Sequence, residues 1–326
     1  MDDGGRARTI VRGGECLHAD RVVHLPDGVI PRAYPYGELV LTTYWVPPES
    51  IAPARNERSL GFRLACETGA FTMNSEGLAF VARKHPLAPT PPGPEWNHAN
   101  AQFGVTWRIP QSMRERIDPT VLRHLDARNP QRFAAAPLQV YPWADPAGNP
   151  ELVLEARVRI PTEELRGAGA HAQFNFMFYV LDTVNGKFFS YIVNLHANPE
   201  EPMTAVRNDG EFAFISAQLP RDGSLQREAR YFRRSAVSRG NSPVAWNDSR
   251  FFRIHVGREH ILNAIHDLNA SDVDGARGFS TDPARYLLTS AGLIQEHVWH
   301  RGESVVMASS FSGFAISLEG GKTAPR

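Results

Sequence analysis

The most constraining feature of the sequence is the stretch QFNFMFYVLDTVNGKFFSYIVNLHAN, residues 173–198, in which two extended runs meet at Asn185-Gly186. Asn-Gly between such runs is the strongest short-range signal for a β-hairpin, because a type I′ turn needs positive φ at both central residues. A two-residue turn also fixes the register, so that Asn175 opposes His196. The chain therefore contains at least one antiparallel β-ladder.

Side chains alternate along a strand, so this hairpin has two distinct faces. The apolar face, which we expect in the core, consists of Phe174, Phe176, Phe178, Val180, Phe189, Tyr191, Val193 and Leu195. The other face carries Asn175, Met177, Tyr179, Leu181, Ser190, Ile192, Asn194 and His196. Charge is nearly absent from this mixed face, unlike a solvated one. Two explanations stay open: a ligand that both stacks and hydrogen-bonds, or a covering loop or helix that satisfies the amides internally.

The stretch RFFRIHVGREHILNAIHDL, residues 250–268, repeats the pattern. Alternation predicts a strand with an apolar face on one side and Arg253 and His255 on the opposite side. A second strand over 260–268, joined by an even-length loop, would place His266 on the same polar face.

The stretch GLIQEHVWH, residues 292–300, is the third such ladder. Ile294 and Val298 are expected in the core. The opposite face of this strand then carries Gln295, His297 and Trp299.

Short extended runs recur from residue 38 to the end, with few helical signals between them. This pattern predicts an all-β protein, a large antiparallel β-sandwich of jelly-roll or concanavalin-like architecture with one or two short helices. In this general architecture, and without a matching family motif, the second half of the chain resembles the concanavalin-like and jelly-roll carbohydrate proteins. A closed β-barrel with a lined interior is the alternative.

The chain is expected to form an irregular N-terminal arm, residues 1–37, and one sandwich domain, residues 38–320. Five prolines in the Pro-rich segment 84–97 predict a surface loop or a lid. Asp118-Pro119 predicts a helix at about 118–128, and Asp282-Pro283 a second one ending near Gly292, because Asp before Pro is an N-cap device.

Composition excludes some partners. The 35 Lys and Arg residues balance 35 Asp and Glu residues, so neither nucleic acid nor an anionic membrane is favoured. Two cysteines are too few for a disulfide framework, and the acidic start lacks the apolar segment of a secretory signal. We expect a cytoplasmic protein; its oligomeric state is left open.

Motifs for the common covalent and metal chemistries are absent from the sequence. No HxH, HExxH, CxxC, GxSxG or phosphate-binding glycine loop occurs, so we expect no metal and no cofactor. Glu296 is the one strand carboxylate in a polar–aromatic setting, whereas glycoside hydrolysis needs two.

The residues that remain suit non-covalent acid–base chemistry, in which an imidazole or phenol moves a proton and Arg or Asn stabilises negative charge. We therefore predict a cofactor-independent lyase, isomerase or cyclase for a small organic or sugar-like ligand. Its catalytic residues would be His196, Tyr179, His255 and His297. Its ligand-binding residues would be Asn175, Asn194, Arg253, Gln295 and Trp299. The alternatives are a lectin-like module that only binds a glycan or small molecule, and a face covered by a partner chain.

Overall fold

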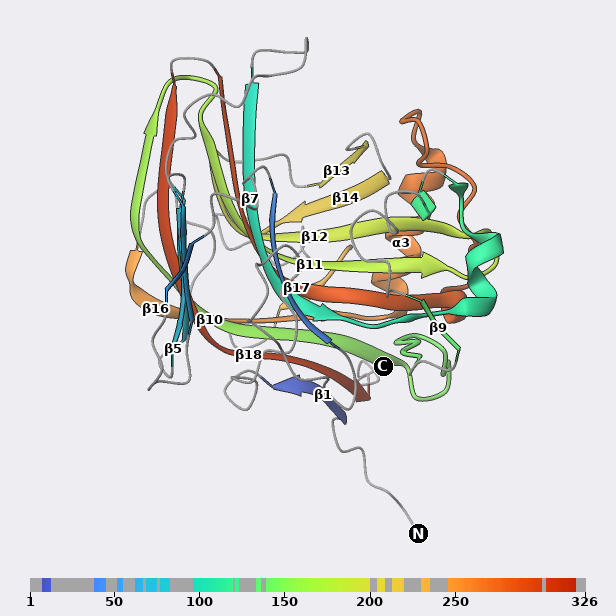
Figure 1. Cartoon of the computed structure of the whole chain (residues 1–326). Coiled ribbons are helices and arrows are strands. Elements are labelled where there is room, and N and C mark those ends of the chain that lie inside the picture. Colours follow the sequence, from blue (N-terminus) through green and yellow to red (C-terminus); the bar gives the residue numbers. More distant parts are fainter. Residues whose placement is uncertain are drawn as a thin grey trace.

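In the computed structural model, two β-sheets face each other across one apolar core (Figure 1). The structure describes residues 8–12, 38–44, 52–54, 62–66, 69–74, 77–82, 96–119, 121–122, 133–135, 139–199, 204–208, 213–219, 230–234, 246–300 and 303–320. No helix in these ranges is long and apolar enough to cross a membrane.

One sheet has seven strands. In order across the sheet they are β13 (Thr204–Asn208), β14 (Ala213–Gln218), β12 (Lys187–Asn198), β11 (His171–Asp182), β17 (Tyr286–His300), β7 (Trp96–Thr106) and β2 (Glu38–Tyr44). All neighbours are antiparallel except β12 and β14, which run parallel.

The other sheet has nine strands. In order they are β15 (Arg233–Arg234), β16 (Trp246–Val256), β10 (Pro150–Arg166), β18 (Ser304–Gly320), β6 (Gly77–Ala82), β5 (Gly69–Asn74), β4 (Phe62–Cys66) and β3 (Ala52–Ala54), with β1 (Arg8–Arg12) also paired to β18. A separate two-stranded sheet joins β8 (Ile109–Pro110) and β9 (Phe133–Ala134).

The core between the sheets confirms the predicted sandwich. It contains all eight residues of the predicted apolar hairpin face, packed against inner residues of β10, β16 and β18. Each sheet ends in an edge strand on both sides within the described part of the chain, so neither closes into a barrel.

The hairpin turn is longer than predicted. Asp182 pairs with Lys187, which leaves a four-residue turn, and Asn175 opposes Asn194 instead of His196. The Asp182 carboxylate makes this turn by accepting hydrogen bonds from the backbone N–H groups of Val184 and Asn185. The register moves by two residues, so the assignment of side chains to faces is unchanged in this part of the ladder.

The predicted strand over 260–268 was wrong. It is part of helix α3 (Arg258–Ala270), whose buried Ile261, Ala264, Ile265 and Leu268 recur at helical intervals. The helix packs against both β14 and β16, at one side of the core. His266 therefore does not extend the face of Arg253 and His255.

The predicted helix after Asp282 is also wrong. Asp282 does cap a turn, since its carboxylate accepts a hydrogen bond from Ala284 N at 3.0 Å, but the turn is the 3-10 helix η3 (Pro283–Arg285). Strand β17 begins at once, and Gly292 lies in its middle, opposite Met177.

At the other predicted helix, Leu122 N donates to Asp118 O at 2.8 Å, after the 3-10 helix η2 (Gln111–Arg116). The rest of that helix, at 123–128, lies outside the described residues, as does nearly all of the Pro-rich segment. The domain limits stay a prediction; residues 8–12 of the expected arm form β1.

Candidate functional site

The predicted site residues do not converge. They lie in three places: between the sheets, on the outer face of the nine-stranded sheet and on the outer face of the seven-stranded sheet. The side chain of Trp299 lies outside the described residues.

His196 lies between the sheets and not on the outer face. A β-bulge inserts Leu195 into β12, so that His196 pairs with Phe174, an inner residue. Its Nε2 lies 2.6 Å from Oε1 of Glu163, on β10 of the opposite sheet. The predicted face was wrong because parity fails beyond a bulge.

Gln295 and His297 also point inward, because Gln295 pairs with the inner residue Phe174. Gln295 Nε2 lies 3.0 Å from His297 Nε2 and donates to the carbonyl of Met307 on β18 at 3.0 Å. The prediction had put Ile294 in the core. It pairs instead with Asn175 and therefore shares the outer face.

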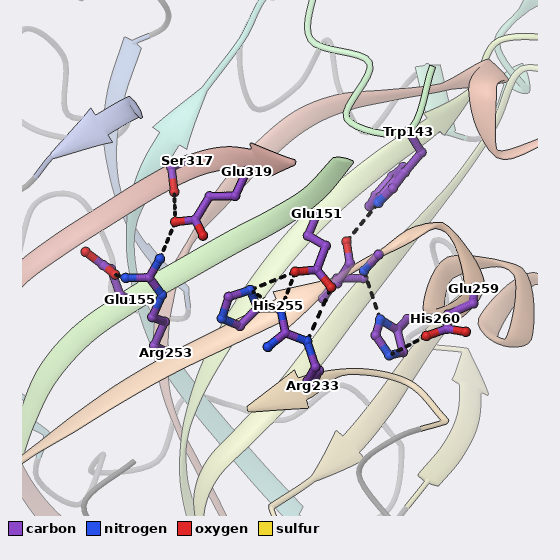
Figure 2. A network of polar contacts seen from close by, with 12 residues as sticks. Trp143, Glu151, Glu155, Arg233, Arg253, His255, Glu259, His260, Ser317 and Glu319 are labelled. Atoms are coloured by element: carbon purple, nitrogen blue, oxygen red, sulfur yellow. Dashed lines mark hydrogen bonds and ion pairs between the residues drawn. The ribbon is translucent and has the colours of Figure 1, made fainter. Parts of the chain in front are cut away.

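Arg253 and His255 lie on the outer face of the nine-stranded sheet, as their alternation with Phe252 and Ile254 predicted. Figure 2 shows His255 and Arg233 both directed at the carboxylate of Glu151. His255 Nδ1 lies 3.0 Å from Glu151 Oε2 and 3.0 Å from Arg233 Nη2. We call these three residues the Glu151 network.

Electrostatics keep Glu151 ionised. Burial alone would raise the pKa of this carboxyl, but the hydrogen bonds from His255 and Arg233 lower its pKa to about 2. The side chain of His255 is 4% exposed, whereas that of Arg233 is 43% exposed. The network therefore presents a cation to solvent above a buried carboxylate–imidazole pair.

Arg253 belongs to a neighbouring set of ion pairs (Figure 2). Its guanidinium contacts Oε2 of Glu155 at 3.1 Å and also the carboxylate of Glu319. Both partners carry the opposite charge, so this arginine is engaged within the sheet.

Asn175 and Asn194 lie on the outer face of the seven-stranded sheet, as predicted, directly opposite each other. On the far side of Asn194, the parallel strand β14 places Gln218 in the same register. Residues opposite each other share a face, so the three form a continuous line across β11, β12 and β14, which we call the amide row.

The amide row is buried, yet most of its polar atoms have no hydrogen-bond partner. Asn175 and Asn194 are 0% exposed and Gln218 is 1% exposed. Asn194 Oδ1 accepts from Ser216 Oγ at 3.3 Å. Five other amide atoms have no hydrogen-bond partner within the described part of the chain: Nδ2 and Oδ1 of Asn175, Nε2 and Oε1 of Gln218, and Nδ2 of Asn194. Buried polar groups are normally paired, so such a row calls for a water or ligand partner.

The ends of this outer face differ. Toward the turn, Tyr179 and Leu181 pack with Phe188 and Leu287 under apolar side chains of the segment 109–122, so a covering segment explains that end. In the opposite direction Gln173 Nε2 donates to the carboxylate of Glu296, one register step beyond the amide row. On the same face of β11, Tyr179 lies two register steps from Asn175 toward the turn, with Met177 between them.

Sequence reasoning missed Gln218, Glu151, Arg233 and Glu163. Gln218 had a signal, because FAFISAQ alternates and places its amide opposite the apolar positions. The other three depend on pairings between strands far apart in the chain. Among described residues, no group of three or more His, Cys, Asp or Glu side chains is placed to hold a metal ion.

No protein-family model and no curated protein matches the chain. Among solved structures it is similar to the family 11 xylanase from Neocallimastix patriciarum, with 8% identity, 85% of this chain and 98% of that chain covered, and a TM-score of 0.34. It is also similar to the endo-1,4-β-glucanase CelB2, with 10% identity, 83% of this chain and 97% of that chain covered, and a TM-score of 0.35. For the family 12 xyloglucanase from Bacillus licheniformis in complex with ligand, the identity is 6%, the coverage is 86% of this chain and 99% of that chain, and the TM-score is 0.29. The strand pairing establishes the sandwich architecture on its own.

Proposed function

We propose that the chain binds a neutral, hydroxyl-rich, sugar-like ligand at the amide row on the outer face of the seven-stranded sheet. The observation that carries this proposal is the alignment of three buried amides with five side-chain nitrogen and oxygen atoms lacking a partner among the described residues. Leaving such atoms unpaired costs about 1–3 kcal/mol each, so a built row of them is costly unless something fills it.

The chemistry of the row defines the ligand class. An amide both donates and accepts hydrogen bonds, and so does a hydroxyl group. The three side chains carry no formal charge, which disfavours an ionic ligand. In the next register row Met177 and Ile192 offer apolar surface to the carbon face of a sugar ring.

The dimensions favour more than one sugar ring. Neighbouring strands are about 4.8 Å apart, so the row extends over roughly 10 Å across three strands. A disaccharide or longer chain lying across the strands would meet each amide in turn. Glu296, held by Gln173, would then lie beside such a chain, one row away.

Calorimetric titration tests the proposal. Soluble xylo-oligosaccharides, cello-oligosaccharides and xyloglucan oligosaccharides are suitable probes, because they are neutral, hydroxyl-rich chains of two or more sugar rings. Asn175→Leu and Asn194→Leu should each weaken binding about ten-fold or more, since each removes hydrogen bonds made in a dry site. The matched control is Asn247→Leu, an exposed amide in β16. It should leave the affinity unchanged.

Protein stability gives a second, independent readout. If a ligand is the natural partner of Asn175, the Asn175→Leu variant without ligand should be about 1 kcal/mol more stable than the wild type, because a similar-sized apolar group replaces two unpaired polar atoms. Loss of stability together with unchanged binding would show that the amide serves the fold, and the proposal would be abandoned.

A second candidate function is proton transfer at the Glu151 network. The geometry in its favour is a buried imidazole oriented by a carboxylate beside a half-exposed guanidinium.

Deuterium exchange into ketoses and uronates in D2O, followed by NMR, tests this proton-transfer function. His255→Gln should lower the exchange rate about 100-fold or more. His266→Gln, whose side chain is 75% exposed, is the control. Equal rates in the His255→Gln variant and the wild type would remove His255 from any catalytic role.

A further inference from the structure

Two separate irregularities bring a carboxylate and an imidazole together inside the sandwich. The bulge at Leu195 turns His196 inward. A second register shift, between Arg159 and Thr162 of β10, ends the run of inner residues at even positions and turns Glu163 inward. Bulges are retained features that re-aim side chains, and here two of them act on the same pair.

The two side chains form a tight, buried pair. Glu163 Oε1 lies 2.6 Å from His196 Nε2, and Asn198 Nδ2 donates to Glu163 Oε2 at 3.0 Å. The side chains of His196 and Glu163 are 0% and 2% exposed. Both carboxylate oxygens are therefore engaged by donors of β12, and we call these three residues the interior cluster.

One polar atom of the interior cluster is left over. Nδ1 of His196 is buried, and no described residue forms a hydrogen bond with it. When Nε2 carries the proton and donates to Glu163, Nδ1 of the neutral ring is an acceptor. The cluster thus offers one imidazole lone pair, aligned by a carboxylate, to a hydrogen-bond donor.

The surroundings define what kind of donor fits. The indole of Trp246 meets the His196 ring edge-on, with the two ring centroids 4.9 Å apart. The guanidinium of Arg250 lies over the indole of Trp246, 4.0 Å from its ring centroid. Asn198 is only half-buried, so the interior cluster reaches the surface there. An aromatic wall beside a lone acceptor suits a flat, weakly acidic alcohol. A carboxylate ligand would be repelled by Glu163.

We propose that the interior cluster is a second binding site, for the hydroxyl group of a small neutral aromatic alcohol, with His196 Nδ1 accepting its hydrogen bond and Trp246 contacting its ring. The site lies on the opposite side of β12 from the amide row, and it does not depend on the function proposed for that row. Phenol is the simplest probe of this class, and toluene is its matched partner without the hydroxyl.

Nitrogen NMR of the protein with 15N-labelled histidine tests the site. The His196 signals are those lost in His196→Gln. Phenol should shift the Nδ1 resonance in a saturable way, and toluene should not. Phenol should also raise Tm in the wild type and in the exposed-site control His266→Gln. In His196→Gln its affinity should fall roughly ten-fold.

Three results would overturn the proposal: equal effects of phenol and toluene, an Nδ1 resonance that phenol leaves unchanged, or unchanged phenol affinity in His196→Gln. If that variant does not fold, the titration of the wild-type protein decides alone. An Nδ1 that already accepts a hydrogen bond from a tightly held water and does not respond to phenol counts against the site.

Discussion

Glu151 is the residue whose charge state links the outer face of the nine-stranded sheet to the stability of the fold. Its pKa falls from 4.5 to about 2, despite the opposing effect of burial, because His255 and Arg233 donate hydrogen bonds to the carboxylate. A lowered folded-state pKa contributes stability that is present above the unfolded value of 4.5 and is lost as pH falls from there through about 2.

We expect Glu151→Gln to lower the free energy of unfolding at pH 7 by roughly 3 kcal/mol, the equivalent of the shift in pKa. The difference from the wild type should shrink as pH falls from 4.5 to 2, because the wild-type carboxyl then also becomes neutral. Urea unfolding at a series of pH values measures this. Glu259→Gln, at a side chain that is 81% exposed, is the control and should follow the wild type. A constant difference at all pH values would contradict the electrostatic explanation.

At the residue scale, the sequence predicted the sheet face on which a side chain lies better than it predicted the side chains that contact it. Asn175, Asn194, Arg253 and His255 lie on the faces that strict alternation gave them. His196 does not, because one inserted residue reverses parity and nothing in the local sequence announces a bulge. Partners such as Glu163 and Glu151 were out of reach for a different reason: each is brought in by a pairing between distant strands.

The hairpin of β11 and β12 shows how an element depends on a single backbone position. Gly186 has φ of +68°, and a Cβ there would lie 1.6 Å from the carbonyl oxygen of Arg116. The turn is also joined to that segment by a hydrogen bond from Asp118 N to Gly186 O at 3.1 Å. Both the conformation and the packing therefore require glycine.

Gly186→Ala should destabilise the protein by roughly 3 kcal/mol, since it adds left-handed strain to a clash with backbone. The matched control is Gly320→Ala at the end of β18, where the nearest atom would be 4.0 Å from the new Cβ. Thermal unfolding of both variants gives the comparison. Equal Tm values would mean that the turn relaxes away from the segment beneath it, and the described contact would be wrong.

Helix α3 is one of two elements that the sequence analysis misassigned. Strict alternation was applied to a run in which Ile261, Ala264, Ile265 and Leu268 recur at helical spacing, and the expectation of another strand prevailed over that period. The helix covers the side of the core between β14 and β16. Its buried stripe should therefore contribute to stability, and its outer side should not.

Two leucines of this helix form a matched pair. Leu268 is 0% exposed, and Leu262 is 37% exposed. Leu268→Ala should cost about 2–5 kcal/mol through lost burial and a cavity. Leu262→Ala should change stability by less than about 0.5 kcal/mol. Chemical unfolding separates the two outcomes. Similar losses in both variants would be expected of a strand or a differently oriented helix, and would contradict the observed packing.

In the whole molecule the polar groups lie in three separate places: the amide row on the outer face of one sheet, the Glu151 network on the outer face of the other, and the interior cluster between the sheets. The sequence predicted the sandwich, since hydrophobic alternation and turn residues recur along the chain, but it treated three polar faces as one surface. Which side of a sandwich a face occupies depends on sheet order. Sheet order is set by pairings such as β10 with β16 and β18, which local patterns do not encode.

This separation makes a prediction about coupling between sites. Asn175 lies on the outer face of one sheet and Glu151 on the outer face of the other, with the core between them and no shared partner among the described residues. Sites without common partners act independently. The change in unfolding free energy of the Asn175→Leu, Glu151→Gln double variant should therefore equal the sum of the single changes within about 0.5 kcal/mol. Glu151→Gln should also leave oligosaccharide affinity unchanged.

The same cycle within one face is the positive control. Glu151→Gln and Arg233→Gln remove two ends of one ion pair, so their effects should fall short of additivity by roughly 1–3 kcal/mol. Urea unfolding at pH 7 measures both cycles under identical conditions. Coupling above about 1 kcal/mol between Asn175 and Glu151 would mean that the two outer faces communicate through the core. The amide row and the Glu151 network would then have to be treated as parts of one site, because a sandwich with independent faces cannot transmit that energy.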